Sequence, residues 1–229
     1  MDTYSKPIAE RIDWLFDLAR RHSAEYSSPE AHLARQRHLA AHPTDIMALK
    51  CMDGRINIPV ATHTPAGIIQ PFRNLGGMFN LGWPHLNEVL AHHVGATVRT
   101  GRQTLVLITY HFSKGDPGRG CAGFNYDTEA AIAHTHAIKE QVEHVFGQGH
   151  GSVYPIVCGF ETDEDALILH GSEGGQLNLA EIAADQGDSL RPWLASLFPD
   201  MSGQMREDLL PLLQRSEEHT SELQSLAYL

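Results

Sequence analysis

The segment Thr104-Leu-Val-Leu-Ile-Thr-Tyr110 is a short run of apolar and β-branched side chains. Such a run is typical of a strand that is covered on both faces, as in the middle of a parallel sheet. His111 follows directly, so an imidazole stands at the carboxyl end of this strand. We therefore take 104–110 as the central strand of a sheet that is flanked by helices.

Four further segments have the pattern of strands, and they alternate with helical patterns. The strands are expected at 46–49, 67–72, 152–160 and 166–170, and the helices at 84–94 and 127–146. Pro155 marks 152–160 as an edge or irregular strand, because proline has no N–H to donate to a sheet. The alternation predicts an α/β fold with a mostly parallel central sheet flanked by helices, with N-terminal helices and a C-terminal helical segment.

The chain divides into four expected parts. Residues 1–42 form an N-terminal helical extension, in which 6–22 has helical spacing and Ser28-Pro29-Glu30 is typical of a helix start. These helices could pack on a partner subunit. The α/β core is expected at 43–175 and C-terminal helices at 176–214. Residues 215–229 look like the in-frame translation of a sequencing-library adapter, so we leave them out of the fold prediction.

Composition and charge narrow the function classes. The formal net charge of −11 argues against nucleic acid as a partner. No apolar run is long enough to span a membrane, and the first residues do not resemble a secretory signal, so we expect a cytoplasmic protein. Three cysteines in such a chain favour a metal or catalytic role over a disulfide framework.

Cysteine and histidine stand where the expected strands end. Cys51 and His111 both follow predicted parallel strands, and the carboxyl edge of an open α/β sheet is where ligands bind. With Cys121 they make two thiolates and one imidazole, a donor set that suits catalytic zinc with a fourth position left open. Asp53 and Arg55 are close enough to Cys51 to share its pocket and to pair with each other. Spacing alone also permits simpler readings, a small buried cysteine and a hydrogen-bonded structural histidine.

These residues lie in motifs that are similar to those of a known family. Cys51-Met-Asp53-Gly-Arg55 resembles the Cys-x-Asp-x-Arg motif of the β-class carbonic anhydrases. Arg73-Asn74-Leu-Gly76-Gly77 is similar to that family's Arg-Asn-Ala-Gly segment, and His111 and Cys121 stand where the family has His-x-x-Cys. The resemblance covers about residues 44–172, in the same order throughout.

The resemblance implies a zinc-dependent carbonic anhydrase. In that family the residues that match Cys51, His111 and Cys121 hold Zn2+, and those that match Asp53 and Arg55 orient the zinc-bound hydroxide and fix the carboxylate. Gly76 and Gly77 would let the backbone approach the substrate. The implied reaction is the reversible hydration of carbon dioxide to bicarbonate, and the implied assembly is a homodimer or a higher homo-oligomer.

One feature departs from the usual family pattern. Nine residues, Phe112–Gly120, separate His111 from Cys121 where most members have two. Such a long spacing is similar to that of the carboxysome shell carbonic anhydrases, a divergent branch, although we do not extend the resemblance to shell association. Two alternatives stay open: hydrolysis of carbon disulfide or carbonyl sulfide in the same fold, and a non-catalytic zinc-containing regulatory or binding module.

Overall fold

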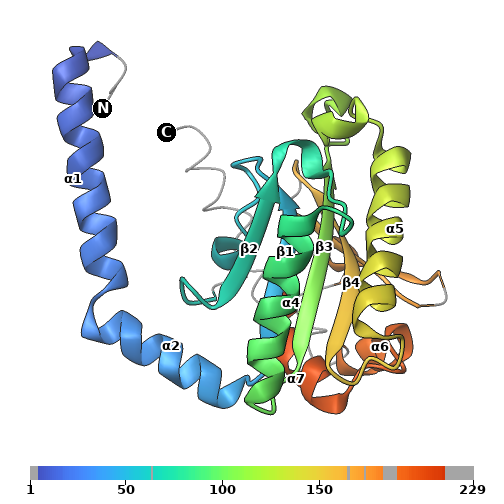
Figure 1. Cartoon of the computed structure of the whole chain (residues 1–229). Helices are drawn as coiled ribbons and strands as arrows, with labels where there is room; N and C mark the ends of the chain where they lie inside the picture. Colours follow the sequence, from blue (N-terminus) through green and yellow to red (C-terminus); the bar gives the residue numbers. More distant parts are fainter. Residues whose placement is uncertain (1–4, 63, 164–165, 173, 183–189, 215–229) are drawn as a thin grey trace.

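A computed structural model describes residues 5–62, 64–163, 166–172, 174–182 and 190–214 (Figure 1). For residues 60 and 61 it describes the backbone alone. The segment that resembles an adapter translation, 215–229, lies outside the described residues.

A six-stranded sheet forms the centre of the molecule, in the order β2-β1-β3-β4-β5-β6. The strands are β1 (Asp45–Cys51), β2 (Ile69–Asn74), β3 (Thr104–Phe112), β4 (Val153–Glu161), β5 (Ala166–His170) and β6 (Gln176–Asn178). The first four run parallel, whereas β5 is antiparallel to β4 and β6 is antiparallel to β5. The mostly parallel α/β fold expected from the sequence is therefore confirmed.

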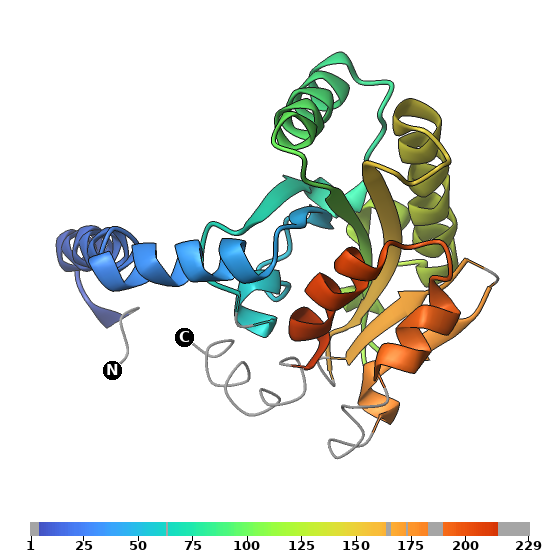
Figure 2. The ribbon, with the colours of Figure 1, turned by 90° about the horizontal axis from the view of Figure 1, so that it is seen from below.

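Helices cover both faces of the sheet (Figure 2). α4 (Pro84–Arg99) and α5 (Thr128–Phe146) lie on one face, and α6 (Leu190–Leu197) and α7 (Gly203–Gln214) on the other. The short elements are α3 (Ile58–Ala61) and the 3-10 turns η2 (Leu75–Gly77), η3 (Pro117–Arg119), η4 (Ala122–Phe124) and η5 (Leu179–Glu181). Because both faces are covered, all of β3 from Thr104 to His111 is buried, as its unbroken apolar run indicates.

Two N-terminal helices extend away from the sheet (Figure 1). α1 (Ile8–Tyr26) leads to α2 (Pro29–Ala41), and neither helix has a buried residue. The expected start of α2 is present, since the Ser28 hydroxyl accepts a hydrogen bond from the backbone N–H of Ala31. Apolar side chains remain exposed along one face of α1, at Ile8, Ile12, Leu15 and Phe16.

The chain after the sheet's main strands differs from the expected run of short helices. The first residues of the expected helical segment at 176–214 instead form β6, the sixth strand of the sheet. Only Leu177 of its three residues is buried, so the strand is too short to show an alternating apolar pattern in the sequence. None of the helices among the described residues has the length and apolar character that crossing a membrane requires.

Candidate metal centre

Three potential ligands meet at the carboxyl edge of the sheet. Cys51 is the last residue of β1, and His111 lies near the end of the adjacent strand β3. The loop after β3 returns Cys121 to the same place, where its Sγ accepts a hydrogen bond from the His111 backbone N–H at 3.4 Å. All three residues are buried, with exposed fractions of 6% for Cys51, 1% for His111 and 2% for Cys121. The structure thus brings together the three residues that the sequence singled out.

The His111 imidazole has an unusual environment. Both of its ring nitrogens are buried, and neither has a hydrogen-bond partner among the described residues. Buried polar atoms nearly always have a partner, so an imidazole without one suggests that a further group belongs beside it. The neighbouring thiols of Cys51 and Cys121 form no disulfide. Two thiols and an imidazole are a donor set that zinc prefers, and these residues therefore fit that ion.

The side chains are adjacent rather than preassembled. Within the described ranges, no group of three or more His, Cys, Asp or Glu side chains is already arranged so that it could hold a metal ion. The burial of the two thiols beside an imidazole without a partner among the described residues still fits zinc, because rotation of these side chains can redirect their donor atoms toward one ion.

The two thiols influence each other's ionisation. The Cys121 side chain lowers the pKa of Cys51 to about 4, against the effect of burial and with help from His111. The reciprocal contact with Cys51, together with burial, raises the pKa of Cys121. One thiol of the pair therefore ionises readily, and the lowered pKa indicates that this thiol is Cys51. A thiolate is the form that binds metal.

Glycines of the turn after β2 allow the backbone to approach this centre. Gly76 and Gly77 have φ values of 76° and 73°, a conformation that side chains other than glycine rarely adopt. A Cβ on Gly77 would lie 3.6 Å from the Cys121 Sγ and 3.9 Å from the Cys51 Cβ. A Cβ on Gly76 would collide with the backbone of Gly123 in η4. The turn therefore packs directly on the two thiol-bearing segments.

Asp53 and Arg55 form a bidentate ion pair beside Cys51. Arg55 donates from Nε to Asp53 Oδ1 at 3.0 Å and from Nη2 to Oδ2 at 2.6 Å, and its backbone N–H donates to Oδ1 at 2.9 Å. Burial alone would raise the pKa of Asp53, but the hydrogen bonds from Arg55 outweigh it and lower that pKa below its usual value. Asp53 is therefore a fixed anion next to the candidate ligands.

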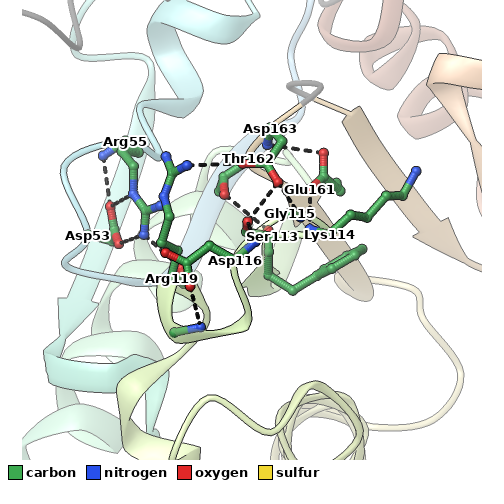
Figure 3. A network of polar contacts seen from close by, with 12 residues as sticks. Asp53, Arg55, Ser113, Lys114, Gly115, Asp116, Arg119, Glu161, Thr162 and Asp163 are labelled. Carbon is green, nitrogen blue, oxygen red and sulfur yellow. Dashed lines mark hydrogen bonds and ion pairs between the residues drawn. The ribbon is translucent and has the colours of Figure 1, made fainter.

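Two residues near the centre gave no clear signal in the sequence. Lys50 is 1% exposed, and its Nζ has no partner among the described residues. Burial, and then the charge of Arg73 on the neighbouring strand, lower the pKa of Lys50 to about 8. Asp163, in the β4–β5 connection, binds the loop between His111 and Cys121 (Figure 3). Asp163 is revealed only by the fold, since it is far in sequence from the loop residues that it contacts. Lys50 directly precedes Cys51, but the burial of its Nζ without a partner among the described residues is seen only in the structure.

A largely apolar cavity lies between the sheet and α7, but it is not the metal centre. Its lining includes Thr109, Cys158, Leu169 and Leu212, and Arg55 is the one candidate site residue that borders it. None of the three potential ligands contributes to its walls. The chemistry is therefore better sought at the sheet edge, where the polar and ionisable groups converge.

This chain matches a known protein family over most of its length. The family described as Carboxysome Shell Carbonic Anhydrase, catalytic domain, matches residues 37–186, well over half of the chain. No curated protein sequence matches this chain.

Solved structures of carbonic anhydrases are also similar to it. The β-carbonic anhydrase CcaA is 15% identical, with a TM-score of 0.49 over 74% of this chain and 92% of that one. The β-carbonic anhydrase CafA of Aspergillus fumigatus is 14% identical, with a TM-score of 0.44 over 82% of this chain and 99% of that one. A carbonic anhydrase from Streptococcus mutans is 15% identical, with a TM-score of 0.36 over 59% and 92% of the two chains. On the family match, this chain belongs to the carboxysome shell carbonic anhydrase catalytic-domain family.

Proposed function

We propose that this protein is a zinc-dependent carbonic anhydrase that converts carbon dioxide and water reversibly to bicarbonate. The observation that carries the proposal is the buried His111 imidazole, whose two nitrogens lack partners among the described residues while two free thiols lie beside it. A metal ion bound to this imidazole and these thiols would supply the missing interaction. Membership in the family supports the same conclusion.

The position of each residue indicates its proposed role. Cys51, His111 and Cys121 would hold the zinc and leave a fourth position for water. When bound, zinc would lower the pKa of that water from about 15.7 toward roughly 7 and so supply a nucleophile at neutral pH. Asp53, kept ionised by Arg55, would accept a hydrogen bond from the attacking water and aim its lone pair at carbon dioxide. The backbone of Gly76 and Gly77 would form the wall next to the two thiols.

The Asp53–Arg55 pair favours a catalytic centre over a structural one. A structural zinc site is closed by four protein ligands and needs no ionised carboxylate beside it. Here Asp53 is held away by two side-chain hydrogen bonds from Arg55. Without Arg55 the carboxylate would be free to turn onto the metal and close the open position.

The proposal is tested by supplying zinc to the purified protein and measuring carbon dioxide hydration by stopped flow. We expect hydration that depends on zinc and is lost on chelation. Hydrolysis of carbon disulfide or carbonyl sulfide without carbon dioxide hydration would refute carbon dioxide as the substrate and identify a hydrolase of the same fold. Bound zinc with no turnover of any of the three would point to a non-catalytic module and refute the proposal.

Replacing Arg55 with lysine should lower kcat for hydration by about tenfold or more while zinc content stays unchanged. A lysine keeps the charge but cannot make the two-pronged contact with Asp53, so the carboxylate loses its orientation. Stopped-flow kinetics and metal analysis on the same samples measure both quantities.

Arg191→Lys is a matched control, because Arg191 makes an equally two-pronged contact with Glu207 in the exposed α6–α7 region. This control should leave kcat unchanged. Equal losses in the two variants, or none in Arg55→Lys, would remove the proposed role of the pair.

We further propose a homodimer, or a larger homo-oligomer, in which α1 contacts a second copy of the chain. The exposed fractions of Ile8, Ile12, Leu15 and Phe16 are 67%, 46%, 57% and 61%, and the four residues share one helix face. A contiguous apolar stripe on a helix that extends from the body is a typical association surface. A second copy would cover it.

The double variant Ile12→Glu/Phe16→Glu should shift the protein to monomers at micromolar concentration, as measured by sedimentation velocity. Two glutamates placed in a buried apolar contact are costly to desolvate. The control Arg21→Glu changes the charge of the same helix by the same amount on its opposite face, and it should leave the oligomer intact. An unchanged oligomer in the double variant would exclude the stripe as the contact.

We also propose a cytoplasmic location. All three cysteines are free, and two of them belong to the candidate metal centre. Thiol ligands stay available in a reducing compartment.

A further inference from the structure

The carboxylate of Asp163 contacts the loop between His111 and Cys121 at several points (Figure 3). Its Oδ2 accepts hydrogen bonds from the Ser113 hydroxyl at 2.7 Å and from the Gly115 N–H at 2.8 Å. Its Oδ1 pairs with Nη1 of Arg119 at 3.1 Å. Asp163 therefore contacts the loop near its beginning and near its end.

A second set of contacts holds Asp163 itself in place. The buried carboxylate of Glu161 accepts hydrogen bonds from the backbone N–H of Asp163 at 3.1 Å and of Lys114 at 2.9 Å. Thr162 donates from its backbone N–H and its hydroxyl to the carbonyl of Phe112, at 2.9 Å and 3.1 Å. The end of β4 thus forms a rigid base on which the Asp163 carboxylate meets the loop.

The loop ends in a contact with the Asp53–Arg55 pair. The backbone carbonyl of Arg119 accepts a hydrogen bond from Nη2 of Arg55 at 2.7 Å, and the same Nη2 donates to Asp53 at 2.6 Å. One nitrogen of Arg55 therefore bridges the carboxylate beside the candidate ligands and the loop carbonyl. The chain of contacts runs from Asp163 through Arg119 to Arg55 and Asp53 (Figure 3).

The composition of the loop explains why a tether is needed. The nine residues include Gly115, Gly118 and Gly120, and glycine has the largest conformational freedom of any residue. An untethered loop of this kind would not keep one carbonyl at a fixed point, because each residue loses entropy when it is ordered. Within the loop, Asp116 caps the η3 turn through its contact with the Gly118 N–H at 3.0 Å, but this bond is local and does not anchor the loop to the sheet.

We propose that Asp163 is a positioning residue for the catalytic pair: it holds the long His111–Cys121 loop so that the Arg119 carbonyl keeps Arg55 locked on Asp53. The expected effect of Asp163 on kcat rests on the proposed function. The extended spacing thus has a role, in which the inserted residues supply a backbone acceptor for Arg55 and Asp163 fixes that acceptor.

The test compares Asp163→Ala and Asp163→Asn with the natural protein, all loaded with zinc. Asp163→Ala removes every contact that the Asp163 carboxylate makes with the loop, while those of Glu161 and Thr162 remain. We expect kcat to fall about tenfold or more, with KM for carbon dioxide within about twofold and zinc content unchanged. Asp163→Asn keeps an oxygen acceptor for Ser113 and Gly115 but loses the ion pair with Arg119, so its kcat should lie between the other two. Glu207→Gln, which breaks an exposed ion pair far from the centre, is the control and should change nothing.

A second readout follows Arg55 without reference to turnover. In the natural protein the Nε–H of Arg55 is bonded to Asp53 and should give a slowly exchanging NMR signal, and in Asp163→Ala its exchange with water should become about tenfold faster. Amides of 112–120 should lose protection in parallel. If Asp163→Ala fails to fold, Ser113→Ala removes one tether contact and should give the same changes on a smaller scale.

The outcomes separate this inference from the proposed function. Unchanged Arg55 exchange and unchanged kcat in Asp163→Ala would overturn the positioning role. Activity lost only in proportion to lost zinc would overturn it as well, because Asp163 would then act on the ligand Cys121 and not through Arg55. If the natural protein shows no hydration, the proposed function fails, while the exchange of Arg55 still decides whether the tether positions it.

Discussion

Replacing Cys121 with serine should remove zinc from the protein and abolish carbon dioxide hydration. The natural chain is expected to bind about one zinc ion, and a neutral hydroxyl is a far poorer ligand than a thiolate. The loss should be nearly complete because two ligands, Cys51 and His111, would remain. Metal analysis after dialysis measures the zinc, and stopped-flow kinetics measures the turnover.

Cys158→Ser provides the matched control for this change. Cys158 is also free and buried, but it lies within β4 and borders the apolar cavity instead of the centre. A serine there should cost about 1–3 kcal/mol of unfolding free energy through a buried hydroxyl and leave zinc content unchanged. A Cys121→Ser protein that keeps its full zinc content would refute the assignment of Cys121 across the long loop.

Gly76→Ala should destabilise the fold and disturb the centre together. The residue has a φ of 76°, and an added Cβ would stand 2.5 Å from the Gly123 Cα in the segment that follows Cys121. The left-handed backbone and the collision should together lower the unfolding free energy by roughly 2–5 kcal/mol. Urea denaturation measures this change, and zinc affinity should fall because η4 must move to make room.

Gly101→Ala separates strain from collision. Gly101 has a similar φ of 73°, but nothing lies within 4 Å of the position that its Cβ would take. This variant should lose only about 1–2 kcal/mol and bind zinc normally. Equal losses of stability in the two variants would show that the close approach of η2 to η4 does not exist in solution.

The sequence predicted the fold well where apolar runs are long. The buried run at 104–110 and the segments at 46–49 and 152–160 correspond to adjacent parallel strands, because strands covered on both faces leave an unbroken apolar pattern. Pro155 indicated an edge or irregular strand, yet β4 lies between β3 and β5. The strand as a whole is therefore not an edge strand. At Pro155, however, β4 pairs with β3 alone, because its pairing with β5 begins only at Val157.

The candidate site was predictable to the extent that it is local in sequence. Cys51, Asp53 and Arg55 lie within five residues, so a single motif places them together. The position of Cys121 depends on the path of a nine-residue loop, which no periodicity describes. Asp163 could not be found at all, because its role arises from contacts with residues more than 40 positions away.

X-ray absorption at the zinc edge of the zinc-loaded protein would identify the atoms that bind the metal. We expect two sulfur ligands at about 2.3 Å and one imidazole nitrogen at about 2.0–2.1 Å, with a water oxygen in the fourth position. Cys121→Ser should remove one sulfur from any zinc that remains bound, and Cys158→Ser should remove none. Fewer than two sulfur ligands in the natural protein, or a lower sulfur count in Cys158→Ser, would refute the zinc site formed by Cys51, His111 and Cys121.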